Sequence, residues 1–348
     1  MHYSSSWRSP SNIALIKYWG KHGIQLPRNP SLSFTLSACH TVMTMVVNNE
    51  ANTPKLTVLF DGMEMPSFIP KIKLFFNLIK DQFPWVETSN VVIDSVNTFP
   101  HGSGIASSAS SMSALALCLV DIDDQLKEKP HANDPSWWRR VSEIARLGSG
   151  SACRSIFPVA ALWGKTEDVT ESNDAFAIPW EDQLAPYYKN YQDTILVVSS
   201  SEKKVSSSAG HELMSSLPYA QTRYAQAGKN LKQLIDSMHH DDQDAQFMSI
   251  CESEALQLHA LMLMGENPYM LIEPNTVSII NAVWNFRKET SVPVCFTLDA
   301  GPNVHLLYPE DHKSSVHDFI KSDLRKFCND GLIIMDEVGE GPKRLNGE

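Results

Sequence analysis

The chain has 348 residues, of which 43% are hydrophobic and 20% charged, and its formal net charge is −11 at pH 7. This length is enough for a sizeable core and for two lobes, and the acidic balance argues against a broad nucleic-acid interface. No apolar run approaches the ~20 residues that cross a membrane, and the first residues contain no apolar core typical of a signal peptide.

The cysteines and histidines give no sign of a disulfide framework or a metal centre. The six cysteines are scattered without a C-x-x-C pair, so we expect reduced, mostly buried thiols in a cytoplasmic protein. No histidine occurs in an H-E-x-x-H pattern, and His239 and His240 lie in a polar, acidic stretch. We expect these two at a solvated helix end.

The first third of the chain is predicted to consist mainly of short strands separated by turns. β-branched and apolar runs predict strands over residues 12–19, 32–36, 41–47, 56–60 and 91–96, with a turn at Asp61 and Gly62. A helix is expected over residues 70–82. Two more follow, one ending near residue 122 and one beginning after Asp134, which is a good N-cap ahead of Pro135.

The second half mixes strands and helices without strict alternation. Strands are predicted over residues 194–198, 294–298, 304–308 and 332–338, and helices over 209–264, 276–288 and 312–327. This pattern indicates an α+β fold with two lobes, which we divide at 1–185 and 186–348.

A glycine- and serine-rich loop, PHGSGIASSAS at residues 100–110, leads from a β-branched run into a good helix former. Its glycines allow a tight backbone path, and Ser107 and Ser108 fall where the helix should begin. Free N–H groups, hydroxyls and the positive end of the helix dipole then make an anion site, which we interpret as a site for a nucleotide triphosphate. A serine-rich linker or an ordinary capped helix is the alternative. The loop is neither a Walker A sequence nor a dinucleotide fingerprint.

Two lysines stand in an apolar and aromatic stretch, SNIALIKYWGK at residues 11–21. On an extended segment Lys17, Trp19 and Lys21 would share one face, and Asn12 and Tyr18 the other. Two such lysines cannot both be buried without anionic partners. They either meet a phosphorylated or carboxylated ligand or extend into solvent from an edge strand.

Two later stretches carry groups that bind anions or accept protons. In GSGSACRS, residues 148–155, small residues let hydroxyls approach an anion and Arg154 can form a bidentate pair with a carboxylate or phosphate. A helix C-cap at Gly148 is the plain alternative. In FTLDAGPN, residues 296–303, Asp299 ends an apolar strand. It is either a turn former or, near an arginine and a lysine, an ionised base.

Taken in their order along the chain, these four stretches resemble those of the GHMP superfamily of small-molecule kinases and, within it, of the mevalonate diphosphate decarboxylases. Residues 100–109 fit the superfamily pattern P-x-x-x-G-[LI]-x-S-S-[AGS], and the resemblance extends from residue 11 to 342. It implies a GHMP-kinase-like two-lobed fold, an ATP-binding N-terminal domain and an active site in the cleft between the lobes. It also implies a homodimer, and the charge and hydropathy described above predict no nucleic-acid or membrane partner.

The implied reaction is the ATP- and Mg²⁺-dependent decarboxylation of mevalonate 5-diphosphate to isopentenyl diphosphate. By resemblance, Asp299, Lys17 and Arg154 are the catalytic residues. Substrate contacts are expected from Asn12, Tyr18, Trp19, Lys21, Ser149, Gly150, Ser151, Arg154 and Ser207. ATP contacts are expected from Gly102, Ser103, Gly104, Ala106, Ser107 and Ser108, with Ser107 as a Mg²⁺ ligand.

Some positions depart from the family's usual residues. Thr-Ala-Ala is common where His101, Gly102 and Ser103 stand, leucine where Ile105 stands, and methionine where His211 stands. Alternative functions are a related kinase or decarboxylase that acts on mevalonate or its monophosphate, and a non-catalytic ligand-binding protein on the same fold.

Overall fold

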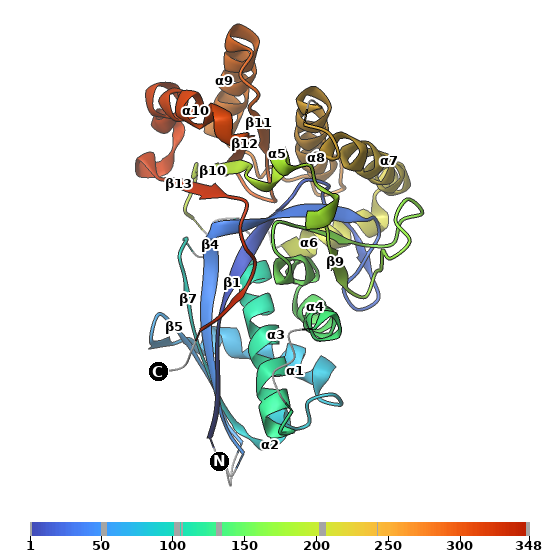
Figure 1. Cartoon of the computed structure of the whole chain (residues 1–348), viewed down its shortest axis with the longest axis vertical. Coiled ribbons are helices and arrows are strands. Elements are labelled where there is room, and N and C mark those ends of the chain that lie inside the picture. The colour runs from blue at the N-terminus through green and yellow to red at the C-terminus, as the bar shows by residue number, and fades with distance from the viewer. Residues whose placement is uncertain are drawn as a thin grey trace.

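The computed structural model describes residues 2–49, 54–100, 105, 107–129, 134–201, 207–241 and 243–345. Figure 1 shows two regions: long strands flanked by helices below, and a smaller sheet covered by helices above. Among the described residues, no helix has the length and apolar character needed to span a membrane.

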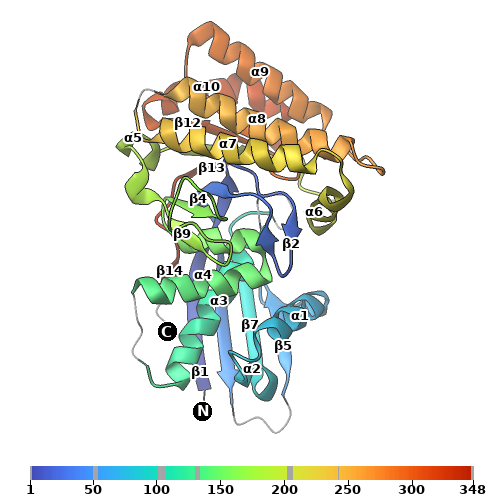
Figure 2. The same cartoon turned by 90° about the vertical axis from the view of Figure 1, so that its right-hand side faces the viewer.

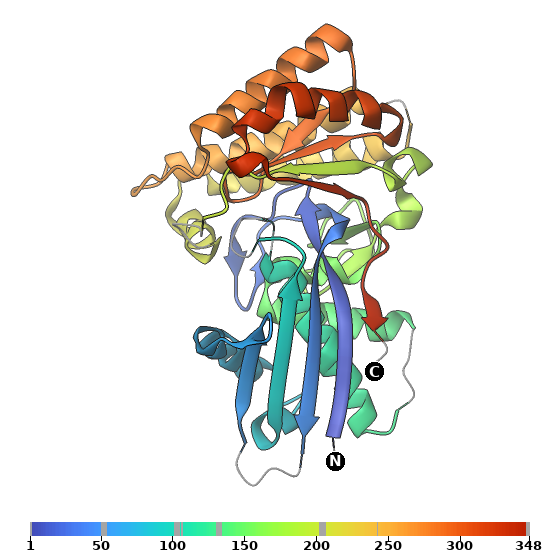
Figure 3. The same cartoon turned by 90° about the vertical axis from the view of Figure 1, so that its left-hand side faces the viewer.

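The lower region is built on an eight-stranded sheet with the order β14-β1-β4-β7-β5-β6, from which β8 pairs with β4 and with β9. Its long strands lie side by side in Figure 3, with the C-terminal strand next to the first. Apart from β5 and β7, which are parallel, all its strand pairs are antiparallel. The strands are β1 (His2–Ala14), β4 (Ser31–Asn48), β5 (Leu56–Phe60), β6 (Met63–Glu64), β7 (Asn90–Asn97), β8 (Ala160–Trp163), β9 (Ala177–Pro179) and β14 (Lys343–Leu345).

Two strand predictions in the first third need correction. The strand expected over 12–19 is the end of β1, which stops at Ala14, and the two strands expected over 32–36 and 41–47 are the single strand β4. The β1–β4 register shifts between Pro10, opposite His40, and Asn12, opposite Thr35. A sequence pattern interrupted by such a bulge is easily taken for two strands.

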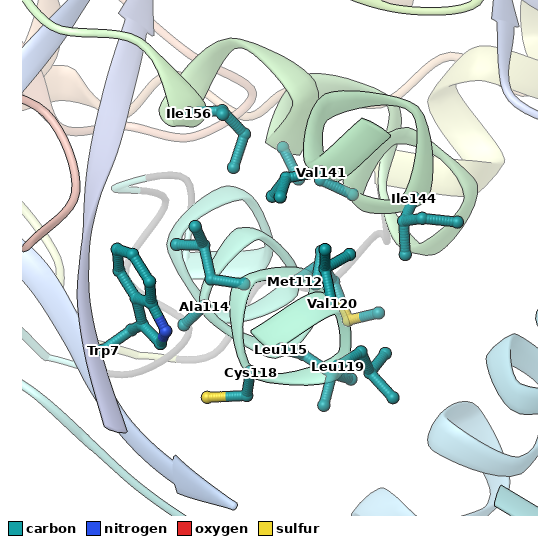
Figure 4. Packing of buried hydrophobic residues seen from close by; sticks show 14 of the residues in the cluster. Trp7, Met112, Ala114, Leu115, Cys118, Leu119, Val120, Val141, Ile144 and Ile156 are labelled. Carbon is teal, nitrogen blue, oxygen red and sulfur yellow. The ribbon is translucent and has the colours of Figure 1, made fainter. Parts of the chain in front are cut away.

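Helices bury the core against one face of this sheet. They are α1 (Ile69–Ile79), α2 (Trp85–Thr88), α3 (Ser107–Leu126) and α4 (Pro135–Gly148), with α4 capped by the Asp134 side chain as predicted. Figure 4 shows apolar side chains of α3 and α4 packed together, with Trp7 of β1 at the edge of the cluster. The ring of Trp7 stacks on Trp137 with a centroid distance of 5.7 Å. This packing holds α3 against β1 and α4.

The upper region is a four-stranded antiparallel sheet with the order β11-β12-β10-β13. Its strands are β10 (Gln192–Leu196), β11 (Cys295–Thr297), β12 (Val304–Tyr308) and β13 (Ile333–Glu337). The helices of this region, stacked over the sheet in Figure 2, are α5 (Pro186–Lys189), α6 (Ser207–Ser216), α7 (Ala220–Met238), α8 (Asp244–Leu263), α9 (Pro274–Thr290) and α10 (Lys313–Phe319). The helical region predicted over 209–264 is therefore three helices, and His239 and His240 are exposed at the end of α7, as expected.

The two regions are joined at the break in the β1–β4 register. The carboxylate of Asp336, on β13, accepts hydrogen bonds from the backbone N–H groups of Ser37, Ala38 and Cys39 at 2.7–2.8 Å. The expected boundary near residue 185 stays a prediction. It lies between β9 and β10, and the chain later returns to the first sheet through β14.

Candidate active site

A cavity of about 310 Å³ lies where the two regions meet. Its lining comes from the segment after β1, helix α1, the start of α3, the end of α4 and the residues after it, helices α6 and α8, and the turn after β11. Four lining side chains are cationic, Lys17, Lys21, Lys71 and Arg154, and Asp299 is the one acidic lining residue among the described residues. In a chain of net charge −11, this local positive charge selects an anionic ligand.

Lys17 and Asp299 form an ion pair across the two regions. The Lys17 Nζ atom lies 3.3 Å from Asp299 Oδ1, and the side chains are 2% and 26% exposed. Burial lowers the pKa of Lys17, and the nearby Asp299 carboxylate opposes that shift. The pair places a carboxylate next to the buried Lys17 side chain at the cavity wall, an arrangement suited to accepting a proton from a bound hydroxyl.

Arg154 is held in place before any ligand binds. It lies in the short 3₁₀ helix Gly150–Ile156 that follows α4, and is buried. Its guanidinium donates to the Asn12 side-chain oxygen at 3.2 Å, to Ser31 Oγ at 2.9 Å and to Ser33 Oγ at 3.1 Å. The amide of Asn12 in turn donates to Ser155 Oγ at 2.8 Å. Asn12 therefore orients Arg154, and the guanidinium is pre-organised for an anionic group.

The aromatic residues Tyr18 and Trp19 also line the cavity. Among the described residues, neither the Tyr18 hydroxyl nor the Trp19 ring nitrogen has a hydrogen-bond partner, although both atoms are buried. Burial raises the pKa of Tyr18, so its hydroxyl keeps its proton and remains a donor. A Cβ atom added to Gly150 would lie 2.9 Å from that hydroxyl. Gly150 is therefore required for Tyr18 to occupy this position.

Lys21 and His211 lie at another part of the wall. Lys21 Nζ lies 3.3 Å from Gln25 Oε1, and burial lowers the pKa of Lys21. His211, on α6, accepts the backbone N–H of Gly20 through Nδ1 at 3.0 Å, and burial lowers its pKa to about 3. The neutral imidazole consequently carries its proton on Nε2.

The start of α3 meets the segment after α4 through serine hydroxyls. Ser149 Oγ donates to Ser108 Oγ at 3.3 Å and lies 3.5 Å from Ser151 Oγ. The Ser107 hydroxyl is buried, with no hydrogen-bond partner among the described residues. Gly102, Ser103, Gly104 and Ala106 lie outside the described residues, as do His101 and the side chain of Ser207.

One expectation about side-chain direction was wrong. Alternation along a strand placed Tyr18 on the face opposite Lys17, Trp19 and Lys21, but all four line the cavity. The reason is that β1 ends at Ala14 and the chain then bends, so the two-residue period no longer applies. Sequence reasoning also missed Lys71, on α1, because one lysine on a helix carries no local signal that separates a site residue from a solvated one.

No group of three or more histidine, cysteine, aspartate or glutamate side chains that could hold a metal ion occurs in the part of the chain that the structure describes. The unpartnered Ser107 hydroxyl at the N-terminus of a 20-residue helix is, however, suited to bind phosphate oxygens or the cation that accompanies them.

Comparisons with known proteins decide the family. Residues 9–177 match the diphosphomevalonate decarboxylase-like N-terminal domain, and residues 194–344 match the mevalonate 5-diphosphate decarboxylase C-terminal domain. The chain belongs to the diphosphomevalonate decarboxylase family. The resemblance inferred from the motifs is thereby confirmed, and the chain is an ATP-dependent lyase of this family.

Relatives that match along almost the whole chain support the same family assignment. A diphosphomevalonate decarboxylase from Ganoderma lucidum is 29% identical over 340 residues, covering 91% of this chain and 81% of the relative. A solved mevalonate diphosphate decarboxylase from Legionella pneumophila is 30% identical and covers 96% of this chain and 100% of that one, with a TM-score of 0.79.

A solved complex described as MDDEF with MVAPP, AMPPCP and magnesium is 28% identical, covers 100% of both chains and has a TM-score of 0.83. These matches confirm the predicted α+β, GHMP-kinase-like fold.

Proposed function

We propose that Asp299, held by Lys17, is the base in the ATP-dependent decarboxylation of mevalonate 5-diphosphate to isopentenyl diphosphate. The observation that carries this proposal is the Lys17–Asp299 pair, 3.3 Å apart, in a cavity whose charged lining residues are mainly cationic. Asp299 accepts the proton of the C3 hydroxyl as that oxygen attacks the terminal phosphorus of ATP, and ADP leaves. Lys17 holds phosphoryl and carboxylate oxygens close to the reacting carbon.

The next step needs no electron sink from the protein. The C3–O bond breaks and phosphate departs with the bonding electrons, which leaves C3 electron-deficient. The electrons of the bond to the carboxylate then form the C2–C3 double bond as CO₂ leaves. Arg154 binds and orients that carboxylate, and Asn12 holds Arg154 through the 3.2 Å contact described above.

The substrate's diphosphate binds at the wall formed by Tyr18, Lys21, Ser149 and Ser151. The Tyr18 hydroxyl and the Trp19 ring nitrogen, both buried and without partners among the described residues, support this assignment because a phosphate oxygen would satisfy them. Ser207, at the start of α6, is proposed as a further contact from resemblance.

ATP phosphates bind at the N-terminal end of α3, where Ser108 and the unpartnered Ser107 hydroxyl lie. Gly102, Ser103, Gly104 and Ala106 are proposed to contribute to the same site. Mg²⁺ would neutralise phosphate charge there, with Ser107 as a ligand. The complex with AMPPCP and magnesium in a relative supports both co-substrate and cation.

The deciding assay uses the purified chain with ATP, Mg²⁺ and mevalonate 5-diphosphate and follows ADP and CO₂ together. Equal yields are expected. ADP without CO₂ would indicate a kinase and require another role for Asp299. ATP binding without either product would indicate a ligand-binding protein. Repeating the assay with the monophosphate tests whether the diphosphate is required.

We expect His211→Met to raise the KM for mevalonate 5-diphosphate about fivefold and to leave kcat within about twofold. The Nε2–H of His211 is a neutral donor at the diphosphate end, and a neutral hydrogen bond contributes about 1 kcal/mol. Because burial lowers the pKa of His211 to about 3, the imidazole is uncharged between pH 5 and 9. The KM ratio between variant and wild type should thus be independent of pH in that range; a ratio that rises as the pH falls would contradict a neutral donor.

Cytoplasmic location and a homodimeric state are also proposed. All six cysteines are unpaired and buried, which suits a reducing compartment. Light scattering after size-exclusion chromatography, giving about twice the chain mass of 38.9 kDa, would support the dimer, and a mass equal to one chain would contradict it.

A further inference from the structure

Helix α8 contacts the main chain of both members of the Lys17–Asp299 pair. The side chain of Glu254 accepts the backbone N–H of Lys17 through Oε2 at 2.8 Å. One turn further along, the Nε2–H of His259 donates to the backbone carbonyl oxygen of Asp299 at 3.1 Å. Residues that are 282 positions apart in sequence are therefore both held by one helix.

The Glu254 carboxylate is itself fixed by buried partners. Glu254 is 0% exposed, and Arg223 of α7 donates to both of its oxygens, with Nη1 at 3.0 Å from Oε1. Asn230, also on α7, donates its amide to Oε1 at 2.6 Å. A carboxylate bound by a bidentate guanidinium and an amide has little freedom to move.

The carbonyl oxygen of Lys17 belongs to the same network. It accepts from Asn29 Nδ2 at 3.0 Å and from Arg223 Nη2 at 3.4 Å. Lys17 lies beyond the end of β1, yet side chains bond both its N–H and its carbonyl. These hydrogen bonds fix the position of the Lys17 backbone and therefore limit the positions that its Nζ atom can reach.

We propose that Glu254, clamped by Arg223, is a positioning residue for the decarboxylation: it holds the Lys17 backbone so that Nζ stays against Asp299. This inference rests on the proposed roles of Lys17 and Asp299. Glu254 acts through Lys17 and does not line the cavity. A displacement of about 1 Å at a reacting group can cost about 10²-fold in rate.

A matched control lies two positions earlier on the same helix. Glu252 is also buried and pairs with an arginine, Arg287, whose Nη1 is 2.6 Å from Oε1. Its other partner is the ring nitrogen of Trp284, at 2.9 Å, and both partners belong to α9, on the side away from Lys17. Glu252→Gln therefore weakens a comparable buried pair without touching the site.

The experiment compares Glu254→Gln with Glu252→Gln for kcat, both KM values, the pH profile of kcat and thermal unfolding. Both variants should unfold at lower temperature. Glu254→Gln should lower kcat about 10- to 100-fold with both KM values within about threefold, whereas Glu252→Gln should keep kcat within about twofold. Loss of the Glu254 charge and a looser contact with Asp299 both leave the Lys17 pKa lower, so the alkaline limb of the Glu254→Gln profile should move to lower pH. Because loss of the charge alone can move this limb, the fall in kcat is the result that tests the positioning role.

If Glu254→Gln retains the kcat of Glu252→Gln at a similar loss of stability, the positioning role is overturned. If Glu254→Gln does not fold, Arg223→Lys is compared with wild type in its place. It keeps the charge but loses the bidentate contact, and should lower kcat by about fivefold to tenfold. Wild-type kcat and pH profile in Arg223→Lys would overturn the proposal. Asp299→Asn in the same assay distinguishes the positioning role of Glu254 from the role of Asp299 as the base. If Asp299→Asn stays active, the role of Asp299 as the base is contradicted.

Discussion

Asp299→Asn is expected to lower kcat by about 10³-fold or more while leaving the affinity for mevalonate 5-diphosphate nearly unchanged. Asparagine has the same shape and keeps an oxygen that can accept from Lys17, 3.3 Å away, but its amide cannot take the proton of the C3 hydroxyl. The change also removes a negative charge from beside a buried ammonium, so the pKa of Lys17 should fall further. Loss of the base and loss of charge on Lys17 both slow the chemical step.

Steady-state kinetics give kcat, and calorimetric titration with mevalonate 5-diphosphate gives the affinity. Asp193→Asn is the control, because Asp193 is also a carboxylate of the upper region, is paired with His305 Nδ1 at 2.9 Å, and does not line the cavity. It should lower thermal stability without changing kcat by more than about twofold. An Asp299→Asn variant that keeps over about a tenth of wild-type turnover would exclude Asp299 as the base.

Arg154→Ala is expected to raise the KM for mevalonate 5-diphosphate by about 10²-fold and to lower kcat by a similar factor. A charge-assisted contact to the substrate carboxylate is lost, which contributes about 1.5–3 kcal/mol to binding, and the carboxylate is no longer oriented for CO₂ loss. The KM for ATP should change little, since the proposed ATP site is at the start of α3. Measuring kcat and the KM values for mevalonate 5-diphosphate and ATP separates the effect on binding from the effect on the chemical step.

Arg140→Ala is the matched control for Arg154→Ala. Arg140 also bonds buried partners, with Nη1 at 3.2 Å from Asp124 Oδ1, but at the opposite end of α3 from the site. Breaking this contact should reduce the free energy of unfolding and leave all kinetic constants unchanged. Arg154→Lys keeps the positive charge but cannot form the bidentate contact of a guanidinium, so its kcat and KM should lie between those of wild type and Arg154→Ala. Unaltered kinetics in Arg154→Ala would refute a role in carboxylate binding.

The site depends on contact between the two regions of the molecule. Lys17 follows a strand of the first sheet and Asp299 follows a strand of the second, so neither region contains the pair by itself. Asp336, Glu254 and Arg223 reinforce this junction from the upper region by bonding backbone groups of the lower one. Destabilising the junction should therefore reduce activity before it unfolds either sheet.

Local sequence was sufficient for most elements of the fold. β12 lies where it was predicted, over 304–308, and α4 begins directly after its Asp134 cap. Capping and periodicity act within one or two turns of chain, so they can be read without knowing the fold. The end of β1 could not be predicted in this way, because the bend at residues 15–16 depends on hydrogen bonds to Leu32 of β4 rather than on local propensity.

The chemical identity of the site followed from motifs, because phosphate and carboxylate chemistry requires particular side chains in a particular order along the chain. Asp299, Lys17 and Arg154 could be named from the sequence, and their roles stay predictions until the variants are measured. The relative positions of these three side chains could not be predicted from the sequence. Glu254 and Arg223 look like ordinary polar residues of two helices, and they become a buried pair on the Lys17 backbone only when α7 and α8 pack against the first sheet. Burial and charge pairing between distant segments arise from packing, which only the tertiary structure decides.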